Sequence, residues 1–222
     1  DEDYSDPESD INRWSKIFAL GGSFDDFIQT LSNDFEPGSK NHYNSMDTQA
    51  LGMLLNRATG QSITSYMTEM LWHPMGAIDE SYWLLDSEGM EMAFAGLNAT
   101  ARDYAKFGEL YRLGGNLNGK QIVPQSWVKD SITPDAPHLM PGNHELSDYP
   151  MGYGYQWWIP EGEEAEFAAI GVYNQFIYVA PQSNMVIVKL SANSIYGTSS
   201  EASFISEMET LEFLRAIANN GS

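Results

Sequence analysis

The sequence predicts an α+β fold, in which a mostly helical part over residues 1–150 precedes an antiparallel sheet and a final helix over residues 151–222. Three observations predict this. Apolar residues recur at helical spacing in the first part, their period changes to two near residue 153, and helical spacing returns after residue 201. With 222 residues, 42% of them hydrophobic and 13% aromatic, the chain can fold into one or two domains.

The first part opens with residues 1–14, which are polar and turn-like. Ser23 can then cap a short helix that extends to Leu31. The clearest helix covers residues 47–58, and Gly60 ends it. Its apolar positions at helical spacing are Ala50, Leu51, Leu54, Leu55 and Ala58.

Shorter elements follow this helix. Ser62 is expected to cap a second helix that ends at His73-Pro74. A β-like section follows, which holds residues 82–85 and 90–95. Thr100 and Asp103 form a capping-box pattern, which opens a helix that a glycine pair ends.

The end of the first part and the sheet are marked by proline and by a change of period. Pro124 indicates a short helix around Trp127, and residues 134–150, with four prolines, predict a long surface loop. Beyond the loop, three segments rich in β-branched and aromatic residues predict an antiparallel meander. The segments are residues 153–158, 168–179 and 185–191.

The last predicted element is a helix over residues 201–218. One side of it is apolar, so we expect this helix to cover one face of the sheet. The residues on that side are Phe204, Met208, Leu211 and Leu214.

Charge and composition exclude several classes of function. The chain carries 31 Asp and Glu residues against 11 Lys and Arg, which gives a net charge of -20 and a pI near 4.2. Such a surface repels phosphate backbones and anionic lipid, so we expect no nucleic-acid partner. No apolar run approaches the roughly 20 residues that span a bilayer, so we expect no membrane insertion.

Cysteine and histidine usage restricts the chemistry. Zero cysteines exclude disulfides, thiolate metal sites and cysteine nucleophiles. The four histidines show no metal-binding spacing such as H-E-x-x-H, so we expect no metal and no cofactor. Residues 1–4 are neither basic nor apolar, so a signal peptide would have to precede them. We favour a periplasmic or secreted location.

Tyr43-Asn44-Ser45 is the first candidate catalytic motif. It lies where an extended segment meets a helix start, a place that exposes side chains and leaves backbone donors unpaired. A tyrosine acts as a base only if a nearby cation lowers its pKa well below the reference value of about 10. The plainer alternative, which spacing alone favours, is that Tyr43 packs half-buried and Ser45 caps the helix.

A second candidate is Gly171-Val172-Tyr173-Asn174-Gln175, which interrupts an apolar pair of strands. A glycine in a strand often marks the close approach of a ligand, and a backbone amide directed into a cleft there can stabilise an oxyanion. The equal alternative is a hairpin bend or bulge. Trp14, Trp157 and Trp158 can line an apolar pocket, although such aromatic residues are more often part of a core.

Ser126-Trp127-Val128-Lys129 matches the S-x-x-K pattern of active-site serine enzymes. Two fixed positions in four residues arise easily by chance in a chain of this length. We therefore interpret this segment as part of an ordinary helix.

Together, these residues resemble the second part of the serine β-lactamase and penicillin-binding-protein superfamily, in the class C-related branch of 6-aminohexanoate-dimer hydrolases and related esterases. The resemblance covers nearly the whole chain, and the order and spacing of its motifs make it specific. The motifs are Tyr43-Asn44-Ser45, Leu71-Trp72-His73-Pro74-Met75-Gly76, Ala95-Gly96-Leu97-Asn98-Ala99-Thr100-Ala101-Arg102-Asp103, Gly152-Tyr153-Gly154-Tyr155-Gln156-Trp157-Trp158 and Ile170-Gly171-Val172-Tyr173-Asn174-Gln175.

The resemblance implies a β-lactamase/DD-peptidase-like fold and assigns roles to particular residues. Tyr43 would be the acid/base residue, in a Y-x-S version of the family's Y-x-N element, and Ser45 would belong to its hydrogen-bond network. The backbone amide of Val172 would be the oxyanion donor. Asn174 stands where the family usually has glycine, which leaves the local strand geometry open. The residues expected to bind substrate are Trp14, Trp158, Ile170 and Gly171.

The resemblance also implies a serine hydrolase that cleaves a small-molecule amide or ester through an acyl-enzyme. In the family, the nucleophilic serine and its lysine lie upstream of the tyrosine motif, and no S-x-x-K precedes Tyr43 here. We therefore expect a missing N-terminal segment with S-x-x-K as a partner, an incomplete fold, and no activity of this chain alone. The alternatives are a D-alanyl peptidase or β-lactamase, and a non-catalytic binding or sensor module.

Overall fold

The computed structural model describes residues 2–4 and 6–221, which form two compact units. Unit 1 comprises Asp1–Asp34 and Tyr43–Thr100, and unit 2 comprises Phe35–His42 and Ala101–Ser222. This division differs from a break at residue 150, because helix α5 (Ala101–Arg112) packs directly on strands β8 (Gln175–Ala180) and β9 (Met185–Lys189). The assignment of residues 1–150 and 151–222 to two subdomains stays a prediction.

Unit 1 is mostly helical, and its first helix corrects the sequence analysis. Residues 10–14 are helical rather than turn-like, because Ser9 caps a helix in which Ile11 and Trp14 lie on the same buried face. Ser23 caps the next helix as predicted, although that helix ends before Leu31. The elements of unit 1 are α1 (Asp10–Ala19), α2 (Phe24–Ile28), α3 (Ser45–Thr59), α4 (Ile63–Met67), the π-helix η1 (Thr68–Trp72), β1 (Tyr82–Trp83) and β2 (Leu97–Asn98).

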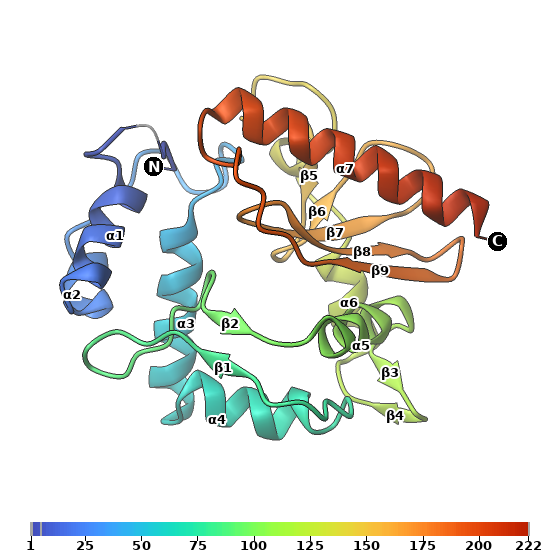
Figure 1. Cartoon of the computed structure of the whole chain (residues 1–222), viewed down its shortest axis with the longest axis horizontal. Helices are drawn as coiled ribbons and strands as arrows, with labels where there is room; N and C mark the ends of the chain where they lie inside the picture. The colour runs from blue at the N-terminus through green and yellow to red at the C-terminus, as the bar shows by residue number, and fades with distance from the viewer. Residues whose placement is uncertain (1, 5, 222) are drawn as a thin grey trace. The chain divides into compact units, whose positions relative to one another are not determined.

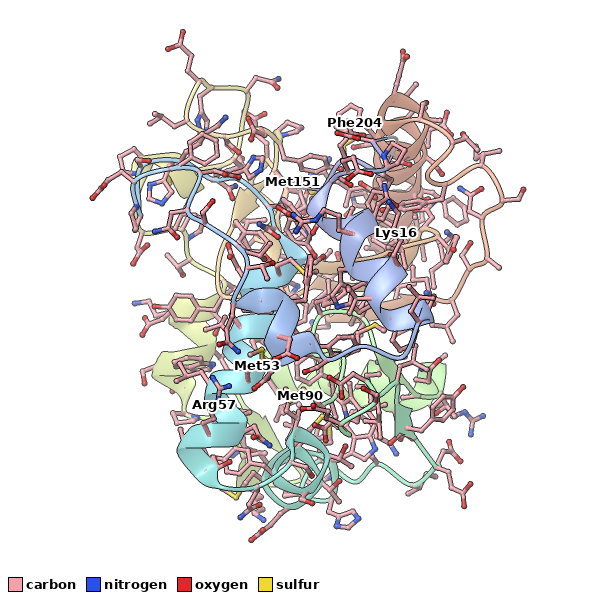
Figure 2. The ribbon with its side chains drawn as sticks, turned by 90° about the vertical axis from the view of Figure 1, so that its left-hand side faces the viewer. Lys16, Met53, Arg57, Met90, Met151 and Phe204 are labelled. Carbon is pink, nitrogen blue, oxygen red and sulfur yellow. The ribbon has the colours of Figure 1, made fainter. Side chains whose placement is uncertain are left out.

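Helix α3 begins two residues earlier than expected and ends, as predicted, at Gly60, whose φ of 67° is left-handed. Its predicted apolar face is wrong, since Leu51 and Leu54 are 54% and 61% exposed. The buried face instead carries Met46, Gln49, Gly52 and Met53. Figure 2 shows Met53 and Arg57 on successive turns of this helix.

Polar and small residues are buried on α3 because the segment around residues 91–93 packs against them and forms hydrogen bonds with them. The side chain of Gln49 donates to the carbonyl of Glu91 at 2.9 Å and accepts from the amide of Ala93 at 2.8 Å. A Cβ atom at Gly52 would lie 2.5 Å from the Cβ of Ala93, so only glycine allows this approach. These tertiary contacts outweigh the apolar spacing of the helix.

The β-like section of unit 1 forms a small antiparallel pair and a further bridge. Strand β1 pairs with β2, and Leu85 bridges to Glu91 across a tight turn. The side chain of Asp86 stabilises that turn by accepting hydrogen bonds from the amides of Glu88 and Met90.

Unit 2 contains the predicted antiparallel meander. Its five strands follow the order β5-β6-β7-β8-β9, and every neighbouring pair is antiparallel (Figure 1). Residues 153–158 are not one strand, because Gly154–Gln156 turn between β5 and β6, with Gln156 at a φ of 67°. The strands not yet placed are β5 (Gly152–Tyr153), β6 (Trp158–Ile159) and β7 (Phe167–Gly171).

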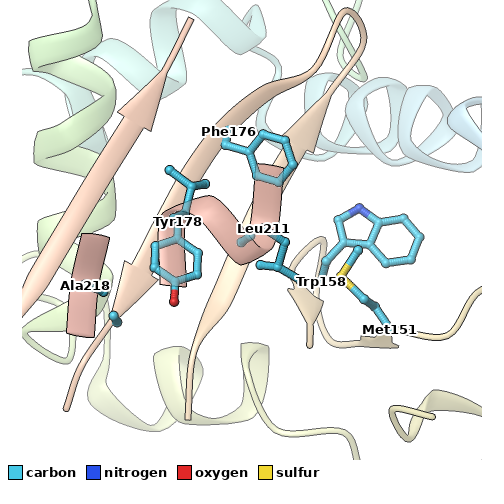
Figure 3. Close-up of a cluster of buried hydrophobic side chains, with 9 residues drawn as sticks. Met151, Trp158, Phe176, Tyr178, Leu211 and Ala218 are labelled. Carbon is cyan, nitrogen blue, oxygen red and sulfur yellow. The ribbon is translucent and has the colours of Figure 1, made fainter. Parts of the chain in front are cut away.

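Helices cover both faces of this sheet (Figure 1). Helix α7 (Ser200–Asn220) buries Leu211 and Leu214 in one cluster with Phe176 and Tyr178. Figure 3 shows Leu211 beside Phe176 and Tyr178. Met208 packs at the edge of this cluster. Phe204 is 37% exposed, and its ring contacts Tyr149 at the rim of the cluster.

The opposite face of the sheet carries helices α5 and α6 (Gln125–Ser131). Tyr111 and Val128 from these helices join Trp157, Phe167 and Val179 in a second buried cluster. The remaining elements of unit 2 are the hairpin of β3 (Asn116–Leu117) and β4 (Lys120–Gln121) and the short 3-10 helix η2 (Pro137–Leu139) within the predicted proline-rich loop. None of the helices in the described part of the chain is both long and apolar enough to cross a membrane.

Candidate active site

The Tyr43-Asn44-Ser45 motif lies at the start of α3. Asn44 has an extended backbone, and its side-chain Oδ1 accepts from the amide of Met46 at 2.9 Å. Asn44 is therefore the capping residue, which removes the alternative that Ser45 caps the helix. Tyr43 is 37% exposed, whereas Ser45 is only 4% exposed.

Glu2 contacts this motif, and the sequence analysis did not identify it. Its Oε1 atom accepts a hydrogen bond from the backbone amide of Ser45, the first residue of α3. Burial raises the pKa of the Glu2 carboxyl above its usual range, while hydrogen bonds from Ser45 and from the Tyr4 phenol act in the opposite direction.

Residues 40–42, which precede the motif, are held by a cluster within unit 2. Asn41 bridges to Ser147, and Lys40 Nζ lies 2.6 Å from a carboxylate oxygen of Asp148. The other oxygen of Asp148 contacts Nδ1 of His42. Burial alone would raise the pKa of Asp148, but the hydrogen bonds from His42 and Lys40 hold it below its usual value.

The Gly171–Gln175 segment is the hairpin turn between β7 and β8. Gly171 pairs with Gln175, and Tyr173 and Asn174 adopt left-handed φ angles of 62° and 68°. The backbone amide of Val172 has no hydrogen-bond partner among the described residues. It is therefore free to donate to another group.

Asn174 fits this turn without distorting it, because asparagine tolerates a left-handed φ that otherwise favours glycine. The buried side chain also ties the hairpin to α7. Its Nδ2 atom donates to Oγ of Ser206 at 2.7 Å and to Oγ1 of Thr210 at 2.9 Å. Lys189 Nζ donates to the Asn174 carbonyl at 2.6 Å on the other side.

The residues predicted to bind substrate lie in two different cores. Trp14 is buried in unit 1, where its ring contacts Phe18, Phe24 and Phe94. Trp158 is buried in unit 2 within the cluster under α7 (Figure 3). Ile170 packs against that same cluster next to the hairpin turn. The structure thus brings Trp158, Ile170 and Gly171 to one region of unit 2, while Tyr43, Ser45 and Trp14 belong to unit 1.

The literal S-x-x-K segment lies on α6. Ser126 and Lys129 both line a cavity of about 490 Å³, whose apolar wall includes Phe167 and Val128. No hydrogen bond joins the two side chains among the described residues. The pair therefore lacks the contact through which a lysine activates a serine.

A model of one protein family matches most of the sequence. The family is described as Beta-lactamase, and its model matches residues 1–202. The chain belongs to the β-lactamase family. The antiparallel sheet with helices on both faces agrees with this membership, and the β-lactamase/DD-peptidase-like fold class is confirmed.

Two proteins are similar to this chain in sequence. It is 29% identical over 199 residues to the 6-aminohexanoate-dimer hydrolase of Paenarthrobacter ureafaciens, which covers 86% of this chain and 50% of that protein. A Bacillus anthracis structure, of a protein proposed to be a 6-aminohexanoate-dimer hydrolase, has a TM-score of 0.80 and 29% identity, and covers 99% of this chain and 58% of its own.

A more distant structure shares the fold alone. A penicillin-binding protein homologue from Caulobacter crescentus has a TM-score of 0.56 at 15% identity, over 83% of this chain and 63% of that one. This β-lactamase-family chain spans about half the length of the curated relative that it matches.

Proposed function

We propose that this chain is part of a serine hydrolase that cleaves a small-molecule amide or ester through an acyl-enzyme. The observation that carries the proposal is the Tyr43-Asn44-Ser45 junction, where a partly exposed tyrosine precedes a buried, hydrogen-bonded serine at the start of α3. Tyr43 is proposed to be the acid/base residue, and Ser45 is proposed to hold its surroundings in place.

The reaction requires more than this motif. A serine must lose its proton to attack the acyl carbon, a lysine ammonium must lower the pKa of the tyrosine, and water must then hydrolyse the acyl-enzyme. We propose that a segment outside these 222 residues supplies both the serine and the lysine in an S-x-x-K motif. The lengths of the relatives support this, since they extend well beyond the matched region.

The β7–β8 hairpin is proposed to supply the oxyanion donor. An amide that is not used in the sheet can donate to the negative oxygen that forms during acyl transfer, and the Val172 amide meets this condition. Trp14, Trp158, Ile170 and Gly171 are proposed to form parts of the substrate-binding wall. Trp158 and Ile170 support the hairpin from within its own core.

The curated relative supports a proposed substrate class. Its name specifies a dimer of 6-aminohexanoate, which favours a short linear amide or a related ester for this protein. The net charge of -20 supports a small-molecule substrate over nucleic acid, because the surface repels polyphosphate.

Turnover of two preparations tests the proposal. We expect the complete protein to hydrolyse short linear amides and p-nitrophenyl esters faster than nitrocefin, and the 222-residue chain alone to show no turnover, because Tyr43 then lacks its lysine. Faster nitrocefin hydrolysis would favour a β-lactamase instead. Absence of hydrolysis by the complete protein would favour a non-catalytic binding module, and turnover by the isolated chain would contradict the proposed missing segment.

A further inference from the structure

Glu2 contacts the proposed catalytic motif from far away in the sequence. It lies 43 positions before Ser45, yet its Oε1 atom accepts the hydrogen bond of the Ser45 amide. The Ser45 side chain also acts to lower the pKa of this carboxyl, against the effect of burial. One acidic side chain thus holds the backbone of the residue two positions after Tyr43.

This contact completes the first turn of α3. The first amides of a helix have no partner within the helix, so each needs another acceptor. Asn44 supplies the acceptor for Met46, and Glu2 supplies the acceptor for Ser45. A negative charge is also favourable at this end of a 15-residue helix, because the helix dipole is positive there.

The second carboxylate oxygen is available for another contact. Oε2 of Glu2 is buried and has no hydrogen-bond partner among the residues that the structure describes. A buried acceptor without a partner is costly, so such groups are commonly found where they serve a function. Among the described residues of unit 1, Ser45 and the Tyr4 phenol act to lower the pKa of Glu2.

We propose that Glu2 is a positioning residue of the Tyr43-Asn44-Ser45 motif, which fixes Ser45 and places a carboxylate beside the motif. Glu2 does not exchange a proton with substrate; it acts through Ser45 on the geometry and electrostatics around Tyr43. This role rests on the proposed function, since it has meaning only if Tyr43 takes part in catalysis.

The contact itself is tested in the 222-residue chain by NMR. The amide proton resonance of Ser45 should lie downfield, because it donates to a carboxylate, and should move upfield in Glu2→Gln. Glu8→Gln is the matched control, since Glu8 is an exposed acid of the same segment that contacts Lys16 rather than the motif. An unchanged Ser45 resonance in Glu2→Gln would overturn the proposal.

The role is tested in the complete protein by kinetics. Glu2→Gln should lower kcat/KM by at least about tenfold, because even a misplacement of a catalytic group by about 1 Å can cost about 10²-fold. In this variant, the acid limb of the pH dependence of kcat/KM should move to lower pH. Removal of a nearby negative charge lowers the pKa of neighbouring acids. A purely structural role would leave the pH profile in place. Thermal melting identifies a variant that fails to fold. If Glu2→Gln does not fold, Glu2→Asp replaces it in the test. This variant keeps the charge and should retain the wild-type pH profile.

The kinetics also separate the role of Glu2 from the proposed function. An active wild type with unchanged Glu2→Gln kinetics refutes only the role of Glu2, whereas a complete wild-type protein without turnover refutes the proposed function and this role with it.

Discussion

Tyr43→Phe in the complete protein is expected to lower kcat/KM by about 10²–10⁴-fold, the usual contribution of a general acid/base residue. The change removes only the hydroxyl, and Tyr43 is partly exposed, so the free energy of unfolding should change little. Steady-state kinetics with a short linear amide and thermal melting of the same sample measure the two effects.

Tyr82→Phe is the matched control for this prediction. Tyr82 is an exposed tyrosine on β1 of the same unit, so the loss of its hydroxyl should leave kcat/KM unchanged. If Tyr43→Phe retained kcat/KM within about threefold of the wild type, Tyr43 would not be the acid/base residue.

Arg215→Ala is expected to lower the free energy of unfolding by about 3–5 kcal/mol, because it leaves a buried carboxylate without its cation. Glu166 is 2% exposed, and Arg215 Nε donates to its Oε1 atom at 2.5 Å. Glu166 also accepts from the Tyr178 phenol, and burial together with this carboxylate raises the pKa of Tyr178 far above its usual value.

A surface ion pair provides the control. Arg57 is 61% exposed and pairs with Asp25, so Arg57→Ala should cost less than about 1 kcal/mol. Urea unfolding of both variants measures the difference. Addition of Glu166→Gln to Arg215→Ala should recover part of the loss, since it removes the unpaired charge. Equal stability of Arg215→Ala and wild type would show that the Glu166–Arg215 pair does not stabilise unit 2.

The spacing of apolar residues predicted the long helices and strands, because these elements extend over the residues that carry the pattern. The α3 and α7 helices and the β7–β8–β9 meander all have strong patterns and end at glycine, turn or cap signals. The buried face of α3 could not be predicted in this way. Gln49 is buried there by hydrogen bonds to a segment more than 40 residues away in sequence, and Leu51 is exposed.

The candidate site was predictable only in its local part. The junction between extended chain and helix at Tyr43 follows from sequence. The turn at Gly171 was one of two equal alternatives, and the structure shows it through the left-handed φ of Asn174. The contact between Glu2 and Ser45 left no local pattern, because the acid and its acceptor belong to separate segments. The capping role of Asn44 was misassigned to Ser45, since both residue types favour that position.

The central claim, a serine hydrolase completed by a segment outside this chain, is tested most directly by labelling. The complete protein is treated with a serine-reactive phosphonate and then analysed by intact mass and peptide mapping. We expect one adduct, on the serine of an S-x-x-K peptide outside these 222 residues, and none on Ser45 or Ser126. An adduct on Ser126, or no adduct on any serine, would contradict the account.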